Sequence, residues 1–426
     1  MLLIFAFLYY IALFFDEYIS FHPFLIAIAL VLTFFLSEGK KVKVLLLVAL
    51  LFAFSSVLDK SEVSITLPYD EVFSISGVAI EDSRIRDAGS GFYIALDYVT
   101  DSYSGYSSAS GVVYVLSERV AFGMGTYVMV KGRFISPDVF LANHIELSGE
   151  SAGYGVRRKC KDFLRTRFSS LDEDERDLAM MLLLGSADSA GTGILEKGRA
   201  KGVSHVFALS GMHLVIISAI ITLPLSLFLS ERKSRALSLP FLFFFTFTSG
   251  FRPSLSRAMI MSLLSFFNIR GEILLLLSFL IHTSFFPLEI MTASSALSYL
   301  ALAGMMYFSP CVRGVDGKLL KSAITSLSAL SFTALYSVLV FSSYTLLSIP
   351  FTIIISPLVS LFMTLSIFSL FLPFLLPILS FLYDLIFNLL SLPDIPFLSG
   401  MAWYDALIFP ALVFLRVRGG KKRTGI

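Results

Sequence analysis

Nine apolar segments follow one another in the second half of the chain, and they restrict its fold more than any other feature. Backbone N–H and C=O groups in hydrocarbon must be paired within the protein, so such segments are expected to be α-helices. Because 56% of the residues are hydrophobic and only 15% are charged, we predict a multi-span membrane protein and not a soluble domain. The segments are residues 205–229, 236–250, 254–268, 273–286, 290–309, 322–342, 345–367, 369–390 and 400–416.

Three more apolar runs lie in the N-terminal segment 1–59, at residues 1–15, 23–36 and 44–58. With the later segments they predict a polytopic α-helical membrane protein of about 12 spans, where a full crossing needs roughly 20 residues. Several segments are shorter and are expected to be re-entrant or broken, above all around 250–253. Non-helical backbone at membrane depth is tolerated only within protein or beside water.

Region 60–150 differs in composition and is rich in Gly, Ser, Tyr and Val. Short runs separated by turn-forming clusters predict β-strands. These strands are expected at residues 73–80, 92–98, 111–116, 126–134 and 140–147. Such a set favours a small β-barrel, and an OB-fold-like domain is the leading interpretation. OB-folds often bind single nucleic-acid strands, but six Lys/Arg stand against twelve Asp/Glu here, which disfavours direct DNA binding.

Segment 151–204 opens with a basic stretch in which Arg157, Arg158, Lys159 and Lys161 lie among apolar positions at helical spacing. This pattern predicts a basic amphipathic helix, which commonly lies at a membrane surface, followed by a linker. The four cations are therefore candidate contacts for lipid headgroups or for DNA.

Basic residues in short loops orient membrane spans, because such loops remain in the cytoplasm. Clusters stand at 40–43, 232–235, 313–321 and 416–423, the last in a basic tail over 417–426. An arrangement of about 12 spans places all four clusters in the cytoplasm. The β domain and the basic helix would then be extracytoplasmic, and both the N- and C-termini would be cytoplasmic.

Residues 204–214 place two of the five histidines beside a hydroxyl and a glycine at the mouth of a span. Polar groups at membrane depth usually face a bundle interior or a hydrated cavity, so His205, Ser210, Gly211 and His213 are candidate lining residues. Ser and Gly can equally serve close packing, and a histidine there can simply bond a carbonyl. In an unbroken helix the two histidines would lie about 80° apart and ~12 Å along the axis, which fits a lining better than a metal site.

Four motifs in order give the chain a resemblance to a known family. They are Leu182-Leu183-Leu184-Gly185; Gly202-x-x-His205-x-x-Ala208-x-Ser210-Gly211-x-His213; Gly250-Phe251-Arg252-Pro253-Ser254-Leu255-Ser256-Arg257-Ala258; and Phe286-Pro287-Leu288 with Leu297-Ser298-Tyr299-Leu300-Ala301. This set resembles the ComEC/Rec2 family of competence proteins. The resemblance implies an inner-membrane channel for transforming DNA, with an OB-fold-like domain in the position of 60–150.

Members of that family often carry a C-terminal metallo-β-lactamase-like domain, proposed to degrade the strand that is not transported. We expect this domain to be lacking here, because the sequence has no His-x-His-x-Asp-His run. Neither nuclease activity nor any other enzymatic activity is therefore expected of this polypeptide.

A single DNA strand needs a hydrated path with some positive potential, because each phosphate carries a charge. The path must also bind weakly enough to release the strand. Arg252 and Arg257 are the cations expected at membrane depth, and Ser254 lies between them. Pro253 is expected to break the helix and direct the two arginines differently. For Arg257 the structural alternative is an internal ion pair or the capping of a helix-end carbonyl. Asp384, in an apolar stretch, is predicted to be a buried ionisable group that pairs with an arginine or relays protons.

Residues 205–416 are thus predicted to form a channel domain that imports single-stranded DNA during natural competence, with no cofactor and no metal. The sequence has no P-loop, so separate proteins are expected as DNA receptor, ATP-driven motor and nuclease, beside the membrane lipids. Two alternatives remain. An intramembrane serine hydrolase would use Ser210 with a histidine base, and a proton-coupled solute transporter would use Asp384 and the histidines.

Overall fold

The computed structural model describes residues 63–65, 67–80, 84–86, 89–101, 105–118, 120, 122–150, 152–185, 193–269, 271–286, 292–313, 315–341 and 348–393. The spans predicted at 1–15, 23–36, 44–58 and 400–416, and the tail 417–426, lie outside the described residues.

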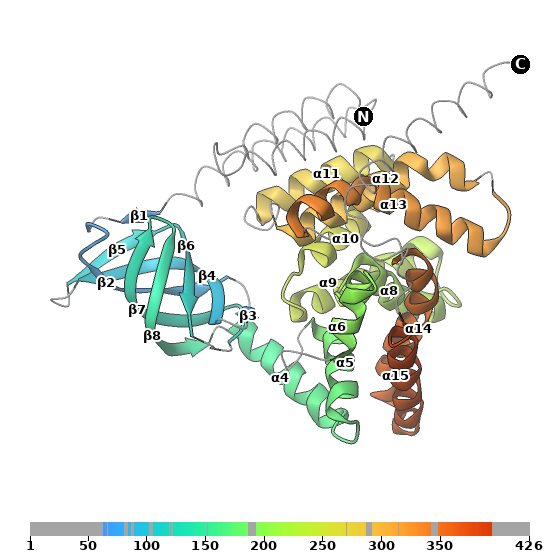
Figure 1. Cartoon of the computed structure of the whole chain (residues 1–426), viewed down its shortest axis with the longest axis horizontal. Helices are drawn as coiled ribbons and strands as arrows, with labels where there is room; N and C mark the ends of the chain where they lie inside the picture. Colours follow the sequence, from blue (N-terminus) through green and yellow to red (C-terminus); the bar gives the residue numbers. More distant parts are fainter. Residues whose placement is uncertain are drawn as a thin grey trace, which may run out of the picture.

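The first described region is an eight-stranded sheet, which lies to the left in Figure 1. Its strands are β1 (Ser64–Ile65), β2 (Val72–Ala79), β3 (Arg84–Arg86), β4 (Gly89–Asp101), β5 (Tyr106–Ser110), β6 (Val112–Ser117), β7 (Thr126–Ser136) and β8 (Val139–Glu150). Pairing runs from β2 to β4, β6, β8, β7 and back to β2, so five strands form a closed ring of pairings. Within this ring β6 and β8 run parallel, and the other pairs are antiparallel.

The five strands of the ring coincide with the five predicted strands, whereas β1, β3 and β5 were not predicted. Successive side chains of a strand point to opposite faces, and in β4 the side chains of Phe92, Ile94 and Leu96 are buried inside the ring. The ladder shifts register beside Gly132, where an added Cβ would stand 2.0 Å from the Leu141 carbonyl oxygen. Glycine is required there because the two backbones approach so closely.

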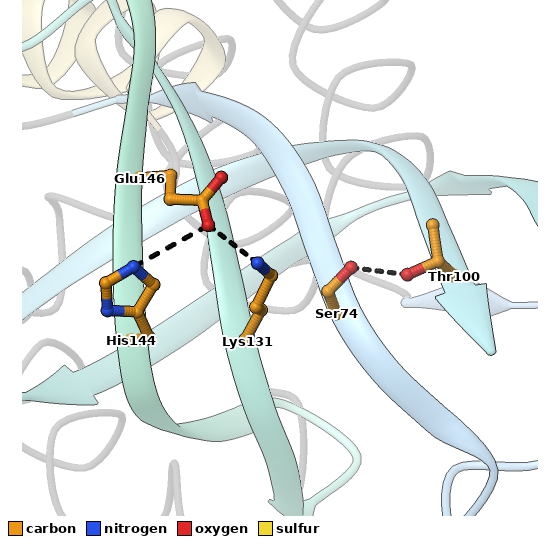
Figure 2. A network of polar contacts seen from close by, with 5 residues as sticks. All are labelled: Ser74, Thr100, Lys131, His144 and Glu146. Atoms are coloured by element: carbon orange, nitrogen blue, oxygen red, sulfur yellow. Dashed lines mark hydrogen bonds and ion pairs between the residues drawn. The ribbon is translucent and has the colours of Figure 1, made fainter. Parts of the chain in front are cut away.

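Figure 2 shows two sets of polar contacts on the strands of this domain. The hydroxyls of Ser74 and Thr100 bond to each other. Lys131 donates to a Glu146 carboxylate oxygen at 2.6 Å, and His144 Nε2 lies 3.6 Å from the same oxygen. The Lys131 ammonium holds the pKa of Glu146 below its usual value through this hydrogen bond and its charge. One of the few cations of the domain is thus already paired with a carboxylate.

The second region is helical and occupies the right half of Figure 1. Its elements are α4 (Ala152–Arg167), α5 (Glu173–Leu184), α6 (Gly193–Ala200), α7 (Ser204–Phe207), α8 (Gly211–Leu225), α9 (Glu231–Thr248), α10 (Pro253–Leu264), η1 (Ser265–Phe267), α11 (Gly271–Phe285), α12 (Ala293–Arg313), α13 (Lys318–Phe341), α14 (Ser348–Ser369), η2 (Pro373–Leu375) and α15 (Leu376–Leu390). Helix α4 leaves the sheet and runs down to the turn where α5 begins (Figure 1). The expected amphipathic helix is therefore present, with Leu164 buried against the helical region and the arginines beside it exposed.

Helices α5, α14 and α15 enclose the largest apolar core of the helical region, which includes Leu178, Leu182, Phe362 and Ile386. Helices α12 and α13 pair closely because Gly304 allows contact, since an added Cβ would lie 2.3 Å from the Ser328 carbonyl. Small residues commonly permit such approach between membrane helices.

Four helical segments of the described chain are long and apolar enough to cross a membrane: Ser204–Leu225, Ala293–Val312, Ser348–Ser369 and Pro373–Leu390. A helical membrane protein is thus supported, and the predicted segments between 205 and 390 are helical, although 205–229 is divided between α7 and α8. The break expected around 250–253 is present between α9 and α10. Gly250 and Phe251 have positive φ, and α10 starts at Pro253, whose missing N–H is unneeded in the first turn.

The unbroken helix assumed for His205 and His213 is wrong. Helix α7 ends at Phe207, Ala208 has an extended backbone, and α8 starts only after Ser210. The two histidines therefore lie on different helices, and the separation calculated for one continuous helix does not apply.

The predicted orientation also needs a correction near the C-terminal end of α14. In the twelve-span order α4 is extracytoplasmic and the turn after α14 is cytoplasmic. However, Arg167 at the end of α4 donates to the Leu370 carbonyl at 2.6 and 2.9 Å. Groups in contact cannot lie on opposite sides of a hydrocarbon core of ~30 Å. The loop-charge argument fails here because residues 322–415 contain no Lys or Arg to orient them.

Candidate functional site

The turn between α7 and α8 is organised by Ser210, the N-cap of α8. Its hydroxyl accepts from the Met212 N–H at 3.3 Å, while its own N–H donates to His213 Nδ1 at 3.0 Å. Together these bonds form a reciprocal capping box, in which His213 takes the place usually held by Glu or Gln. The hydrogen bonds of Ser210 and His213 therefore cap the amino terminus of α8.

His213 is fully buried, and the hydrogen bonds define its roles. Because Nδ1 accepts the Ser210 N–H, the neutral ring carries its hydrogen on Nε2. That nitrogen has no hydrogen-bond partner among the described residues. An unpaired buried donor is expensive, so this atom is the first sign that the junction has capacity for a polar ligand.

Gly211, the first residue of α8, faces α10 at close range. A Cβ built on Gly211 would lie 3.3 Å from the Ala258 Cβ and 3.5 Å from Arg257 Nη2. The glycine thus brings the guanidinium of Arg257 next to the first turn of α8. The helix dipole makes such a turn attractive to anions.

Arg257 also lies against an aromatic residue of α12, Tyr299, which is hydrogen-bonded to α11. Its guanidinium carbon lies 5.7 Å from the centre of the buried Tyr299 ring, and its Nε has no hydrogen-bond partner among the described residues. The Tyr299 hydroxyl donates to the Ser278 carbonyl at 3.1 Å and lies 3.2 Å from His282 Nδ1. Neither the ion pair nor the carbonyl cap considered for Arg257 is seen in the described part of the chain.

Arg252 points elsewhere, as the break at Pro253 predicted. Its Nη2 donates to the Gly185 carbonyl at 3.0 Å, and Gly185 is the left-handed C-cap of α5. A cation at the carboxyl end of a helix satisfies a free carbonyl and complements the dipole. Arg252 therefore joins α5 to the α9–α10 turn, while Ser254 bonds Ser298 at 3.2 Å and joins α10 to α12.

The basic helix α4 uses two arginines in the same way. Arg157 donates to the Thr248 carbonyl at 3.1 Å, at the end of α9. Arg167 makes the corresponding contact with Leu370 just past α14. Arg158 and Lys159 are exposed and Lys161 is half-buried. Of the four predicted contacts for DNA or lipid, Arg157 is thus engaged at the end of a helix.

The sequence analysis missed Lys201, which is 4% exposed. Its ammonium donates to the Leu392 carbonyl at 2.6 Å, beyond α15, and lies 5.2 Å from the centre of the Phe351 ring. A backbone carbonyl leaves no signature in the sequence, so no pattern could have linked these residues.

Two predicted positions differ from expectation. Asp384 was predicted to be buried, but its side chain is exposed, because it lies off the apolar face of α15 formed by Leu379, Leu382, Tyr383 and Ile386. His205 is exposed on α7, outside the contacts around Arg257.

The residues that meet at this junction lie in a region of the chain that is similar to a known protein family. A family model for competence proteins matches residues 182–416, which is more than half of the chain. Neither the curated proteins nor the solved structures gave a match. The matched residues contain Gly185, the α7–α8 turn, the α9–α10 break and Arg257. The chain therefore belongs to the competence protein family.

Proposed function

We propose that this protein is a membrane channel that imports single-stranded transforming DNA across the cytoplasmic membrane. One structural observation supports the proposal in addition to the family match. The guanidinium of Arg257 stands beside Gly211 in the first turn of α8, and its Nε has no partner among the described residues.

This arrangement suits a phosphate diester. An arginine donates to phosphate oxygens in a planar fork, and the amino terminus of a helix adds positive potential. A single cation and one helix end bind an anion weakly, which allows a strand to be released and advanced. The absence of a Cβ at Gly211 leaves room for close approach of the backbone.

The junction is closed in the state described. Leu209 and Leu214 pack against Leu255 and Met259 around the contact between α8 and α10. A strand can pass only if these helices separate, so the described arrangement would be the resting state of the channel. The close approach of α8 and α10 at Gly211 and Ala258 is where that separation would begin.

The remaining parts take supporting roles in this proposal. The closed ring of strands is an OB-fold-like β-barrel on the extracytoplasmic side. The spans number about 12, with the turn after α14 on the same side of the membrane as α4. The polypeptide has no enzymatic role and no cofactor. Separate proteins supply the DNA receptor, the ATP-driven motor and the nuclease.

The test compares two arginines that lie five residues apart. Uptake of labelled linear DNA is measured in a strain that lacks this gene and is complemented with wild type, Arg257→Ala or Arg252→Ala. We expect Arg257→Ala to abolish uptake at unchanged membrane abundance, and Arg252→Ala to lower abundance because it removes a helix cap. Normal uptake by Arg257→Ala would refute the role given to this junction.

A second function, that of an intramembrane serine hydrolase, has one observation in its favour. Ser210 Oγ lies 3.0 Å from His213 Nδ1, within reach for a nucleophile and its base. Against it, the same Nδ1 accepts the Ser210 backbone N–H, and His213 Nε2 has no orienting partner among the described residues. A fluorophosphonate probe decides between the two. Labelling that Ser210→Ala abolishes would establish the hydrolase, whereas a channel stays unlabelled.

A further inference from the structure

A concavity of about 230 Å³ lies between the first turn of α5 and the middle of α15, away from the junction described above. Its lining residues are Asp172, Glu173, Asp174, Glu175, Tyr383 and Asp384. Five carboxylates thus surround one small space, on a chain whose formal net charge is +2.

Local structure explains only part of this group. Asp172 is the N-cap of α5, and its N–H donates to Glu175 Oε2 at 3.2 Å in a capping box. Carboxylates are favourable in the first turn of a helix because they complement its dipole. Asp384 belongs to α15, about 200 residues away, so helix capping gives no reason for its presence.

Two of the lining residues are buried. Glu175 is 6% exposed, and its carboxylate also accepts from Ser380 Oγ at 2.8 Å. Tyr383 is 7% exposed, and its hydroxyl has no hydrogen-bond partner among the described residues. Both residues line the concavity together with Asp174 and Asp384. A buried hydroxyl without a partner is unfavourable unless a ligand supplies one.

None of the five carboxylates forms an ion pair with a Lys, Arg or His in the described part of the chain. Like charges that converge without a counter-charge repel one another, and a cation placed between them would relieve this repulsion. The ligand that fits this site therefore carries positive charge.

The chemistry of the site favours an organic cation over a metal ion. No group of three or more acidic, His or Cys side chains in the described residues is arranged to hold a metal. The site is also lined along one side by Tyr383, which stacks on Phe387 at an interplanar angle of 18°. An aromatic residue among carboxylates suits an ammonium or guanidinium group.

We propose that this concavity is a docking socket for a lysine or arginine side chain from a basic segment of a partner protein. The proposal requires that the face of Pro373–Leu390 around Asp384 is in contact with water, although this segment is long and apolar enough to cross a membrane. The cation lies between Asp174 and Asp384, and the Tyr383 hydroxyl accepts from it. The proposal does not rest on the passage of DNA through the junction at Gly211 and Arg257.

The test uses the full-length chain in a non-ionic detergent. The probe is a fluorescent peptide of alternating arginine and glycine, and its control is the same peptide with citrulline, which keeps the shape of arginine without its charge. Binding is followed by fluorescence polarisation at several salt concentrations. We expect the arginine peptide to bind in a salt-dependent manner, and the citrulline peptide to bind at least about tenfold more weakly.

Variants locate the binding. Asp384→Asn and Asp174→Asn should each weaken the arginine peptide about tenfold, and Tyr383→Phe, which removes one oxygen, should weaken it about threefold. Asp316→Asn and Glu272→Gln, exposed carboxylates elsewhere, remove the same charge and should have no effect. Equal losses in these controls would overturn the proposal, because the attraction would then be non-specific. It would also be overturned if the arginine peptide did not bind, or if Ca²⁺ or Mg²⁺ alone bound through the same residues and displaced it.

Discussion

Helix α4 and the junction of α8 with α10 both carry arginines, but those arginines differ in what they already contact. Arg157 and Arg167 on α4 donate to carbonyls at the ends of α9 and α14. Arg257 at the junction contacts an aromatic ring and keeps an unpartnered Nε among the described residues. The number of cations in a segment is therefore a poor guide to its capacity for DNA. What matters is how many remain after the helix ends have been capped.

The largest expected effect is an all-or-none difference in labelling, and it tests the contact made by Arg167. Single cysteines at Ser170 and Phe371, both exposed, are placed in a chain with Cys160 and Cys311 replaced by serine. An impermeant thiol reagent should label the two positions from the same side of the membrane. Labelling from opposite sides would show that Arg167 does not contact Leu370 at the end of α14. Arg167 would then no longer differ from Arg257 as a helix-capping residue.

The next effect separates function from stability. Arg257→Gln should reduce DNA uptake per inserted molecule more than tenfold and leave thermal stability nearly unchanged, because the charge it removes is unpaired. Arg157→Gln should behave in the opposite way. It removes a partly buried charged hydrogen bond and should lower the unfolding free energy by about 1 kcal/mol, with normal uptake per molecule. The comparison fails if both variants lose uptake equally.

A smaller effect is expected at the capping box. His213→Leu removes the acceptor for the Ser210 N–H and should destabilise the protein by about 1 kcal/mol. Glutamine is a usual residue at this position of a capping box, so His213→Gln should retain most of both stability and uptake. If the Gln variant is folded and inserted but as inactive as the Leu variant, imidazole chemistry is required and the hydrolase becomes the preferred function.

The smallest effect concerns an exposed pair on the β domain. Lys131 lowers the pKa of Glu146 in the folded state, so this pair stabilises the fold above the usual pKa of 4.5. That contribution is lost as the pH falls through the lowered pKa of the folded state. Lys131→Gln should therefore reduce stability slightly at neutral pH and not at all well below pH 4.5, as measured by thermal unfolding across this range. A pH-independent loss would mean that Lys131 acts through packing.

Sequence patterns predicted those features that depend on local periodicity. Short runs between turn-forming clusters predicted the strands of the ring, and hydropathy with Pro253 predicted the helices and the α9–α10 break. The interruption before α8 was missed because Ser210 and Gly211 are compatible with a continuous membrane helix. A signal was nevertheless present, since Ser210 and His213 have the spacing of a capping box.

Other features could not be read from the sequence because their partners are distant or belong to the backbone. The carbonyls of Gly185 and Leu370 accept hydrogen bonds from Arg252 and Arg167. Any residue type can supply a backbone carbonyl, so the sequence does not indicate these contacts. The prediction that Asp384 is buried was wrong for a different reason. Its apolar neighbours were taken as a sign of burial, although the helical spacing of Leu382, Tyr383 and Ile386 leaves Asp384 off the buried face.

The parallel pair β6–β8 has a consequence for how the chain is made. The ring of strands closes only when β8 has paired with both β6 and β7, so the domain is incomplete until residue 150 has been synthesised. Domains generally fold as units in the order in which they leave the ribosome, and residues 182–416 follow later. A substitution that delays the docking of β8 would expose an open strand edge to other chains during that interval. Its damage would appear as aggregation during synthesis, even in a protein that is stable once complete.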